Sequence, residues 1–177
     1  MNPPRYDRTT IMLHWGIAVL IIAQWLGAHA IDWFPKGPYR VDARSVHIVC
    51  GGLMVMALLY RIYWRSTRGV RFPKPPGLNP DTLAKLVHYA LYALMAVVLG
   101  LGVFNAWLRG DDIFGLFHIP KFGSYEKEVR HLFVNLIVDW HRLASNILLL
   151  LAAGHALVAL VHNYILKDDV LKRMALK

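Results

Sequence analysis

Four long apolar stretches dominate this chain of 177 residues. They run from about 11–31, 44–64, 83–108 and 139–166, and polar segments rich in proline and glycine separate them. Each stretch reaches the roughly 20 residues that a helix needs to cross the hydrocarbon core of a bilayer. A helix satisfies its backbone polar groups internally, as lipid requires. The sequence therefore predicts an all-α integral membrane protein, a four-helix bundle formed by one domain over residues 1–177.

The composition is that of a membrane bundle rather than a soluble domain. Hydrophobic residues make up 56% of the chain, and its formal net charge is +9. In a soluble protein such a charge suggests binding to nucleic acid. Here the basic residues flank the apolar stretches, and Lys and Arg are enriched beside membrane spans. We therefore expect membrane lipid as the surrounding partner and no nucleic-acid binding.

The distribution of basic residues predicts how the bundle is oriented. The N-terminus, the segment between the second and third stretches and the C-terminus carry twelve Lys and Arg, against eight on the other side. The positive-inside rule places the richer side in the cytoplasm, so both termini are predicted to be cytoplasmic. The sequence leaves open whether a separate outer surface helix, near 129–138, precedes the fourth stretch.

Histidines recur near the ends of these stretches. His141 and His155 lie fourteen residues apart in the fourth stretch, a rise of about 21 Å along a helix. Fourteen steps of about 100° return to within roughly 40° of the starting direction, so both rings leave the same helix face. Imidazole is a common axial ligand of haem iron. A helix face with one imidazole toward each side of a bilayer is the arrangement that two stacked haems need.

Depth in the membrane groups four histidines into two pairs. His47, near the start of the second stretch, matches His141 on the outer side. His14, near the start of the first stretch, matches His155 on the inner side. Each pair can hold one haem between two helices, with the irons roughly 20 Å apart. His88 is the main alternative to His14 on the inner side.

Two further features bear on haem binding. Cys50 is the single cysteine and the sequence Cys-x-x-Cys-His is absent, so covalent attachment of a c-type haem is excluded. Gly51 and Gly52 follow His47, and their missing side chains leave room either for a macrocycle or for close helix packing. Two non-covalent haems of the b type are the predicted cofactors.

These motifs resemble a known family. Ile-Met-Leu-His-Trp around His14, His47 at the start of the second stretch, Trp-His at 140–141 and Gly-His-Ala at 154–156 are similar to the bacterial cytochrome b561 family. The likeness continues through 161–168 and covers nearly the whole chain. It implies that the histidines of these four motifs are the haem ligands, in the pairs given above, and that the protein crosses the bacterial inner membrane several times.

The resemblance also implies an activity. The best-defined reaction of the family is the oxidation of superoxide on the periplasmic side, with electrons passing through two haems to reduce ubiquinone in the membrane. Other members resemble electron-transfer subunits that relay electrons between a partner dehydrogenase and the quinone pool, for which the outer segment 109–130 would be a docking surface. A histidine-lined metal transporter is a third alternative, although few carboxylates lie within the apolar stretches.

Superoxide is an anion, and basic residues at the outer ends of the ligand helices can attract it. The outer side as a whole sums to only +1, so local clustering of cations has to supply this attraction. The candidates for this role are Arg44, Arg142, Lys36, Arg40 and Arg130.

Reduction of a quinone needs protons as well as electrons, and a histidine can deliver a proton near neutral pH. His162 follows the inner ligand His155 on nearly the same helix face. Lys85 and His88 begin the third stretch at matching depth. We therefore predict that a ubiquinone headgroup binds near the inner haem, in contact with His162 and with Lys85 or His88.

Overall fold

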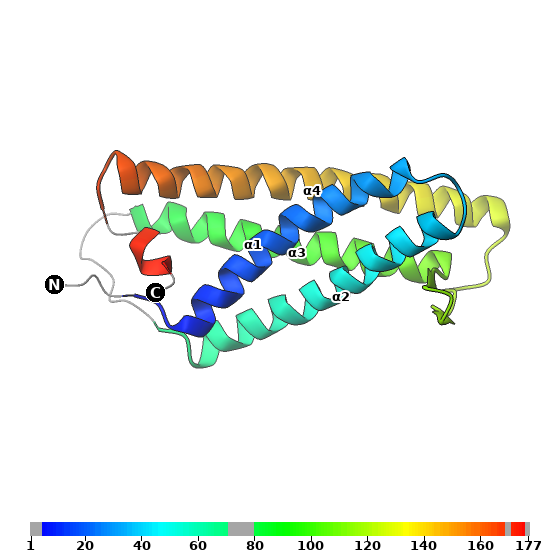
Figure 1. The fold of residues 1–177 in the computed structure, drawn as a ribbon, viewed down its shortest axis with the longest axis horizontal. Helices are drawn as coiled ribbons and strands as arrows, with labels where there is room; N and C mark the ends of the chain where they lie inside the picture. The colour runs from blue at the N-terminus through cyan, green and yellow to red at the C-terminus, as the bar shows by residue number, and fades with distance from the viewer. Residues whose placement is uncertain (1–4, 71–79, 169–170, 176–177) are drawn as a thin grey trace.

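The computed structural model describes residues 5–70, 80–168 and 171–175. Four long helices run alongside one another in it (Figure 1): α1 (Arg8–Ala30), α2 (Pro38–Thr67), α3 (Pro80–Arg109) and α4 (Lys127–Tyr164). Between and after them lie three short elements, namely the 3-10 helices η1 (Ile31–Trp33) and η2 (Leu171–Met174) and a hairpin of β1 (Asp112–Ile113) with β2 (Phe117–His118). The prediction of an all-α four-helix bundle is confirmed.

The helices extend beyond the predicted apolar stretches. α2 begins at Pro38 rather than near residue 44, and α4 begins at Lys127 rather than near residue 139. α4 runs without a break through 129–138, so no separate surface helix precedes it there. A helix can project past the bilayer, because its polar ends are stable in water. Three residues of the charge count lie outside the described part of the chain: Arg71, Lys74 and Lys177.

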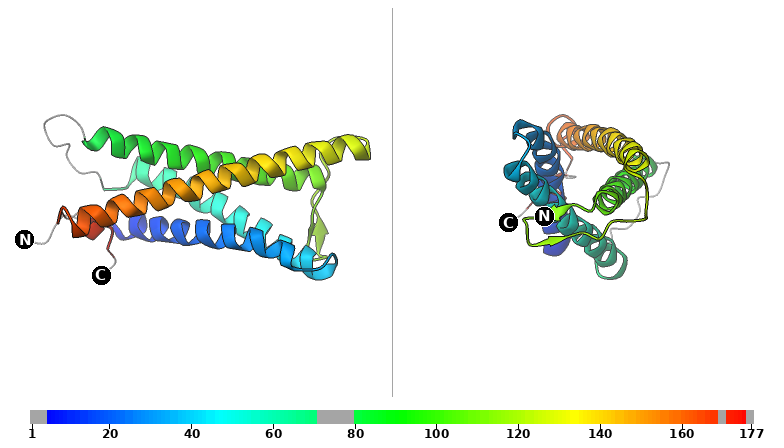
Figure 2. Two further views of the ribbon diagram at one scale, coloured as in Figure 1. Left: turned by 90° about the horizontal axis from the view of Figure 1, so that it is seen from above. Right: turned by 90° about the vertical axis from the view of Figure 1, so that its right-hand side faces the viewer.

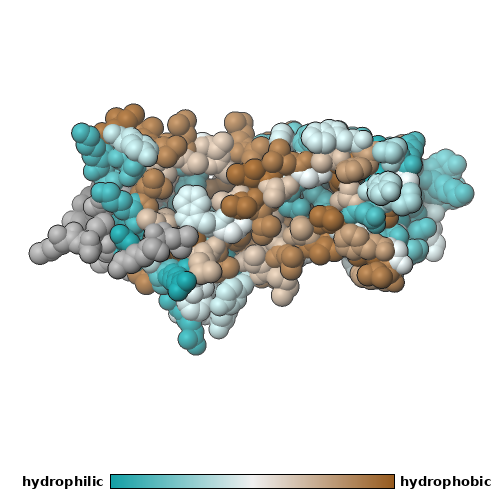
Figure 3. All heavy atoms as spheres, in the orientation of Figure 1, coloured by the Kyte–Doolittle hydropathy of each residue, from teal (hydrophilic) through white to brown (hydrophobic). Residues whose placement is uncertain are grey.

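Apolar side chains cover the outside of the bundle. All four helices are long and apolar enough to cross a membrane. Large side chains such as Val19, Leu53 and Leu150 are nevertheless 59–75% exposed. Figure 3 shows apolar residues gathered over the middle of the helices and polar residues toward both ends. Such a surface is stable against lipid rather than water, and the chain is accordingly a multi-pass membrane protein.

The bundle is assembled from two helix pairs. α1 packs along α2 and α3 packs along α4, as the end-on view in Figure 2 shows. A small apolar core joins the two pairs, and its residues are at most 6% exposed: Ile17, Met54, Leu58, Met95 and Leu148. Leu148 lies midway along α4 between His141 and His155. The core therefore separates the two ends of the bundle, where these histidines lie.

The two ends of the bundle differ in the elements that lie there. The hairpin β1–β2 lies at the end where α3 finishes and α4 begins, which we call the outer end (Figure 1). The start of α1, the end of α4 and η2 lie at the other, inner end. Gly110 ends α3 with a left-handed φ of 63°, a conformation that glycine adopts without strain. The assignment of the inner end to the cytoplasm stays a prediction from the charge count.

Asp7 ties the start of α1 to the end of α2. Its carboxylate accepts hydrogen bonds from the N–H of Thr10 (2.8 Å), the hydroxyl of Thr10 (2.7 Å) and the indole N–H of Trp64 (2.8 Å). The N–H of Val70 donates a further bond at 3.2 Å. Burial by itself raises the pKa of this carboxyl, but the hydrogen bonds from Thr10, Trp64 and Val70 outweigh burial and lower the pKa to about 2.

Replacing Asp7 with alanine is expected to destabilise the protein, because an N-cap carboxylate typically contributes about 0.5–2 kcal/mol. The pKa of Asp7 in the folded state lies below its unfolded value of about 3.9. Its contribution is therefore complete above that value and is lost as the pH falls toward 2. Thermal unfolding in detergent across this range measures the effect, with Asp42→Ala at an exposed carboxylate as the control. The prediction is wrong if acid lowers the melting temperature of the wild type no more than that of Asp7→Ala.

Candidate functional site

Two histidine pairs lie at opposite ends of the bundle. At the inner end, His14 of α1 and His155 of α4 have ring centroids 6.2 Å apart and ring planes at 81°. At the outer end, His47 of α2 and His141 of α4 have ring centroids 6.3 Å apart and ring planes at 82°. The structure thus brings together the same two pairs that helix depth predicts. α4 contributes one ring to each pair.

The spacing within each pair leaves room for a metal ion between the rings. A histidine nitrogen bonds a metal at about 2 Å and lies about 1.1 Å from its ring centre, so rings on opposite sides of one ion have centroids about 6 Å apart. A bare ion would need further protein ligands, and the described residues contain no group of three His, Cys, Asp or Glu suited to holding one. A haem iron takes four ligands from its macrocycle, so two histidines suffice.

Helix α3 fixes the ring of His141. The Nδ1 atom of His141 lies 2.9 Å from the carbonyl oxygen of Val98. Because a carbonyl can only accept, we assign the proton to Nδ1, which leaves the lone pair of Nε2 for a metal. Gly102 faces the same ring, and a Cβ at this position would lie 3.1 Å from Cε1 of His141. A hydrogen bond and a missing side chain therefore set the position of this ring.

His47 is held through its backbone rather than its ring. Its carbonyl oxygen accepts a hydrogen bond from Nε2 of Gln24 in α1 at 2.9 Å, while its Nδ1 is buried without a hydrogen-bond partner in the described part of the chain. A Cβ on Gly51 would lie 3.3 Å from the same Gln24 nitrogen, whereas one on Gly52 would meet nothing within 4 Å. Gly51 thus permits close packing of α1 on α2, whereas the space beside Gly52 is open.

The inner pair has a third histidine beside it. The ring centroid of His88 in α3 lies 5.1 Å from that of His155, which is shorter than the distance of about 6 Å for two rings across one metal ion. His14 meets this distance. The geometry therefore favours His14 over His88 as the partner of His155. The Nδ1 atom of His88 also bonds to the carbonyl oxygen of Ala84, which orients its ring.

His162, two turns beyond His155, forms a hydrogen bond with Asp168. The two side chains approach to 2.6 Å between Nδ1 and a carboxylate oxygen. Lys167 adopts a left-handed φ of 54° after the end of α4, and the N–H of Asp168 then donates to the carbonyl oxygen of His162 at 3.1 Å. The turn that ends α4 thus returns the carboxylate of Asp168 to the ring of His162.

The other residues predicted for a quinone site are not joined to His162. Lys85 and His88 both lie exposed near the start of α3. Among the described residues, no hydrogen bond, ion pair or ring contact links either of them to His162. Their participation in a shared site stays a prediction.

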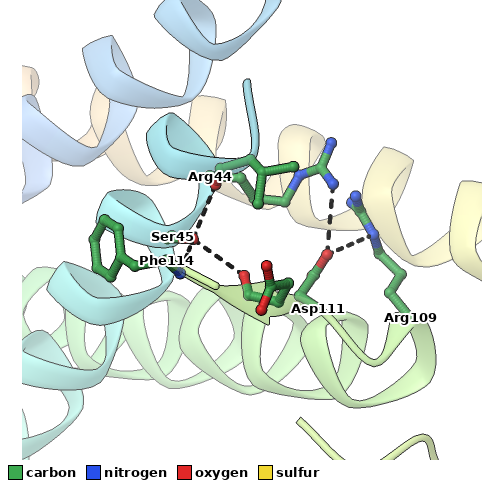
Figure 4. Close-up of polar contacts among 7 residues, drawn as sticks. Arg44, Ser45, Arg109, Asp111 and Phe114 are labelled. Atoms are coloured by element: carbon green, nitrogen blue, oxygen red, sulfur yellow. Dashed lines mark hydrogen bonds and ion pairs between the residues drawn. The ribbon is translucent and has the colours of Figure 1, made fainter. Parts of the chain in front are cut away.

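The outer end contains a buried ion cluster. Arg44 lies 3.5 Å and Arg109 lies 3.3 Å from the same carboxylate oxygen of Asp111, which is 8% exposed (Figure 4). Ser45, which is fully buried, accepts a hydrogen bond from the N–H of Phe114 at 3.1 Å. These contacts attach the hairpin to the start of α2, close to His47. The charge of Arg44 is therefore partly offset by Asp111.

The other predicted outer cations differ in the ion pairs and hydrogen bonds that they form. Arg40 pairs with Asp32 at 3.6 Å, and Arg130 donates to three backbone carbonyl oxygens. Arg142 is exposed and forms no ion pair in the described part of the chain. Lys36 is likewise exposed and without an ion pair among the described residues, so Arg142 and Lys36 have the charges most available to an anion from solution.

Three residues of the site are not predicted from the sequence. Arg61 contacts His14, Asp168 pairs with His162, and Gly102 faces His141. Arg61 carried a detectable signal, because it is an ionisable residue inside the predicted stretch 44–64, and charges inside membrane spans are commonly functional. Gly102 carried none, because the contact that requires a glycine comes from another helix.

Comparison with known proteins identifies the family of this chain. The family model of the prokaryotic cytochrome b561 matches residues 5–176. The chain is 30% identical to cytochrome b561 homolog 1 of Escherichia coli (strain K12), over 96% of each protein. It is also 30% identical to cytochrome b562 of Cereibacter sphaeroides, over 97% of this chain and 95% of that protein. It is 26% identical to the probable superoxide oxidase CybB of Yersinia pestis, over 96% of this chain and 95% of that protein.

A cytochrome b carries haem b, and imidazole is a common axial ligand of haem iron, so the chemistry of the histidine pairs fits such a group. The match to the family model spans nearly all of the chain, including all four long helices. The family is found in bacteria, which places a multi-pass member in the inner membrane. This chain therefore belongs to the prokaryotic cytochrome b561 family of membrane electron-transfer proteins.

Proposed function

We propose that this protein is a dihaem cytochrome b that oxidises superoxide on the periplasmic side and reduces ubiquinone in the membrane. The observation that carries the proposal is the presence of two histidine pairs of matching geometry at opposite ends of one bundle. The name of the Yersinia pestis relative, a probable superoxide oxidase, supports the choice of reaction. Two superoxide anions lose one electron each to give two O2 molecules, and both electrons with two protons convert one ubiquinone to ubiquinol.

The histidine pairs have defined roles in this proposal. His47 and His141 hold the outer haem, and His14 and His155 hold the inner haem. When bound, the haems supply one-electron carriers that span the membrane. α4 sets the separation of the two sites, because it contributes a ligand to each and is one unbroken helix between them. The apolar core around Leu148 keeps water out of the space between the sites.

Arg142 is the proposed attractant for superoxide. It is exposed, adjacent to the outer ligand His141, and free of ion pairs in the described part of the chain. An uncompensated cation raises the local concentration of an anion, and salt screens the effect. Arg44 contributes less, because Asp111 offsets part of its charge.

The proposed quinone site lies at the inner end, beside His162. Asp168 accepts a hydrogen bond from the Nδ1–H of His162, so Nε2 of His162 can exchange a proton with a quinone oxygen. Lys85 and His88 are the candidates that would contact the quinone from α3. Also at the inner end, an apolar hollow of about 320 Å³ lies beside Trp15, the residue after His14, and could receive an isoprenoid tail.

Replacing Asp168 with asparagine is expected to slow quinone reduction between about 10-fold and 100-fold, by analogy with the loss caused by removing the hydrogen-bond partner of a metal-ligating histidine. An amide can donate to Nδ1 of His162 and so reverse which ring nitrogen carries the proton. Haem content and reduction of the haems by superoxide should not change. Stopped-flow reoxidation of the reduced protein by ubiquinone measures the effect, with Asp42→Asn at the outer end as the control. Equal reoxidation rates in wild type and Asp168→Asn would contradict this role.

One observation favours the alternative of an electron-transfer subunit for a partner dehydrogenase. The hairpin at the outer end presents apolar side chains to solvent, with Leu116 81% and Phe117 59% exposed. Exposed apolar patches of this kind often mark protein contacts. In this alternative the same two haems relay electrons, and the donor docks on the outer segment 109–130 rather than diffusing to it.

A superoxide pulse applied to purified protein of known haem content tests the proposal. Two b-type haems per chain that are reduced within the pulse, and reoxidised when ubiquinone is added, are the expected result. Two haems that are not reduced by superoxide but accept electrons from another donor would favour the subunit alternative. Protein without haem would contradict the assignment of the histidine pairs, and with it both functions.

A further inference from the structure

Arg61 is a buried cation beside the inner histidine pair. It lies in the last turns of α2 and is 8% exposed. The buried polar and charged side chains of the described residues are Thr10, Ser45, Arg61 and Asp111, so Arg61 is the one cation among them. A charge at such a depth is costly in a membrane protein, and intramembrane charges are generally retained for a function.

The guanidinium of Arg61 is held by neutral groups. Its Nε donates to the hydroxyl of Tyr92 at 2.9 Å, and its Nη1 donates to the carbonyl oxygen of Thr10 at 3.2 Å. The ring centroid of Tyr92 lies 6.0 Å from the guanidinium carbon. No carboxylate lies within ion-pair distance of Arg61 in the described part of the chain. Three helices, α1, α2 and α3, therefore fix a positive charge without compensating it.

This charge is directed at an inner haem ligand. Nη2 of Arg61 lies 3.4 Å from Nδ1 of His14, which is longer than the about 2.7–3.2 Å of a strong N–H hydrogen bond. An arginine can only donate, and a histidine that binds metal through Nε2 carries its proton on Nδ1. The contact therefore acts through the proximity of a positive charge to the ligand. At the outer end, by contrast, Arg44 and Arg109 share Asp111, and Arg142 beside His141 is exposed, so that solvent screens its charge.

The effect of such a charge on an electron carrier has a definite sign. Reduction adds one negative charge to the metal site, and a fixed cation nearby stabilises it through Coulomb attraction. The attraction is strong at this depth, because little water screens it. An arginine keeps its charge at any physiological pH. Hydrogen bonding and charge around the axial ligand are among the means by which a protein sets a haem potential.

We propose that Arg61 is a positioning residue for electron transfer: it raises the reduction potential of the haem held by His14 and His155 above that of the haem held by His47 and His141. This inference rests on the proposed function. The step that it favours is the transfer of one electron from the outer site to the inner site. Outer iron is oxidised from ferrous to ferric, and inner iron is reduced from ferric to ferrous. No bond forms or breaks, and no proton is transferred. Arg61 thereby directs electrons toward the quinone end.

Arg61→Met tests this by removing the charge while keeping an unbranched side chain of similar reach. A spectroscopic redox titration of the haem-loaded full-length protein measures the midpoint potential of each haem. The potential of one haem is expected to fall, and the potential of the other is expected to stay unchanged. We expect the equilibrium constant for reduction of the inner haem to fall at least tenfold, a shift of about 59 mV for one electron. Arg61→Lys keeps the charge, so its inner potential should fall by less than half of the fall in Arg61→Met. Arg68→Met, at an exposed arginine of the same helix end, should change neither potential.

Three results would overturn the proposal. The first is a protein with Arg61→Met that keeps both haems and both potentials. The second is a fall of equal size in Arg61→Met and Arg61→Lys, which would assign the effect to side-chain shape rather than to charge. Arg61→Gln is a second neutral variant in case methionine prevents folding. Loss of the inner haem from both neutral variants would show that Arg61 holds haem rather than tunes it, and would also contradict the proposal.

The same titration separates this inference from the proposed function. A wild-type protein with fewer than two haems per chain contradicts the proposed function, whatever Arg61 does. A wild-type protein with two haems, combined with unmoved potentials in Arg61→Met, contradicts only the role of Arg61. Tyr92→Phe adds an independent measurement, because it leaves the charge in place but removes the hydroxyl that holds Nε. It should lower the inner potential by less than Arg61→Met does.

Discussion

Replacing His155 with alanine is expected to reduce the haem content from the proposed two per chain to one. The variant removes one proposed axial ligand of the inner pair, and among the described residues the outer pair of His47 and His141 has no contact with it. The remaining haem should still be reduced by superoxide but should no longer pass its electron to ubiquinone. Haem absorbance against protein concentration measures the first effect, and ubiquinol formation measures the second.

The control for this experiment is His131→Ala in the same helix. His131 is exposed, and its ring contacts Asn135 rather than another histidine. Its replacement should leave two haems per chain. If His155→Ala retained both haems, the pairing of the inner site would be wrong.

A second pair of variants decides between His14 and His88 as the partner of His155. The ring spacing of 6.2 Å to His14 fits a metal between the rings, and the spacing of 5.1 Å to His88 is too short for one. We therefore expect His14→Ala to lose the inner haem and His88→Ala to keep it. The reverse outcome would exchange the two assignments.

Replacing Gly102 with valine is expected to remove the outer haem. A Cβ at this position would lie 3.1 Å from Cε1 of His141, tighter than ordinary contact, and the two methyl groups of valine require still more room. The ring cannot simply move away, because the carbonyl oxygen of Val98 holds its Nδ1 at 2.9 Å and a haem iron would hold its Nε2. Haem content should fall from two per chain to one while the inner potential is retained.

Gly100→Val is the matched control for this prediction. Gly100 lies in the same helix, but a Cβ there would meet nothing within 4 Å. The two variants therefore impose the same loss of glycine and the same β-branched side chain on α3. If both lost haem equally, the effect would come from α3 itself and not from the ring of His141.

The apolar stretches and the histidine spacing were sufficient to predict the architecture and the two pairs. A helix that crosses a bilayer needs a long apolar run, so hydropathy locates such helices with few alternatives. The separation of His141 and His155 along one helix then follows from helix geometry alone. Hydropathy predicts a start for α4 near residue 139 instead of at Lys127, because hydropathy detects the part of a helix in lipid and not its extension into water.

At the inner site, helix depth alone does not determine which histidines pair. Helix depth left His14 and His88 as alternatives, because both lie at the same level in different helices. The distance between ring centroids separates them, and that distance depends on how far and at what angle α1 and α3 approach α4. Hydrophobic periodicity gives the face that a helix turns inward, but it does not give the neighbour that the face meets.

What surrounds each ring depends on contacts between helices that are distant in sequence. The hydrogen bond from His141 to Val98, the close approach of Gly102 and the charge of Arg61 beside His14 all join different helices. Local sequence sets which residues are apolar, how long each helix is and where its histidines lie. The rotation and spacing of packed helices set which donor, charge or gap each histidine meets, because these depend on side-chain packing across the whole bundle.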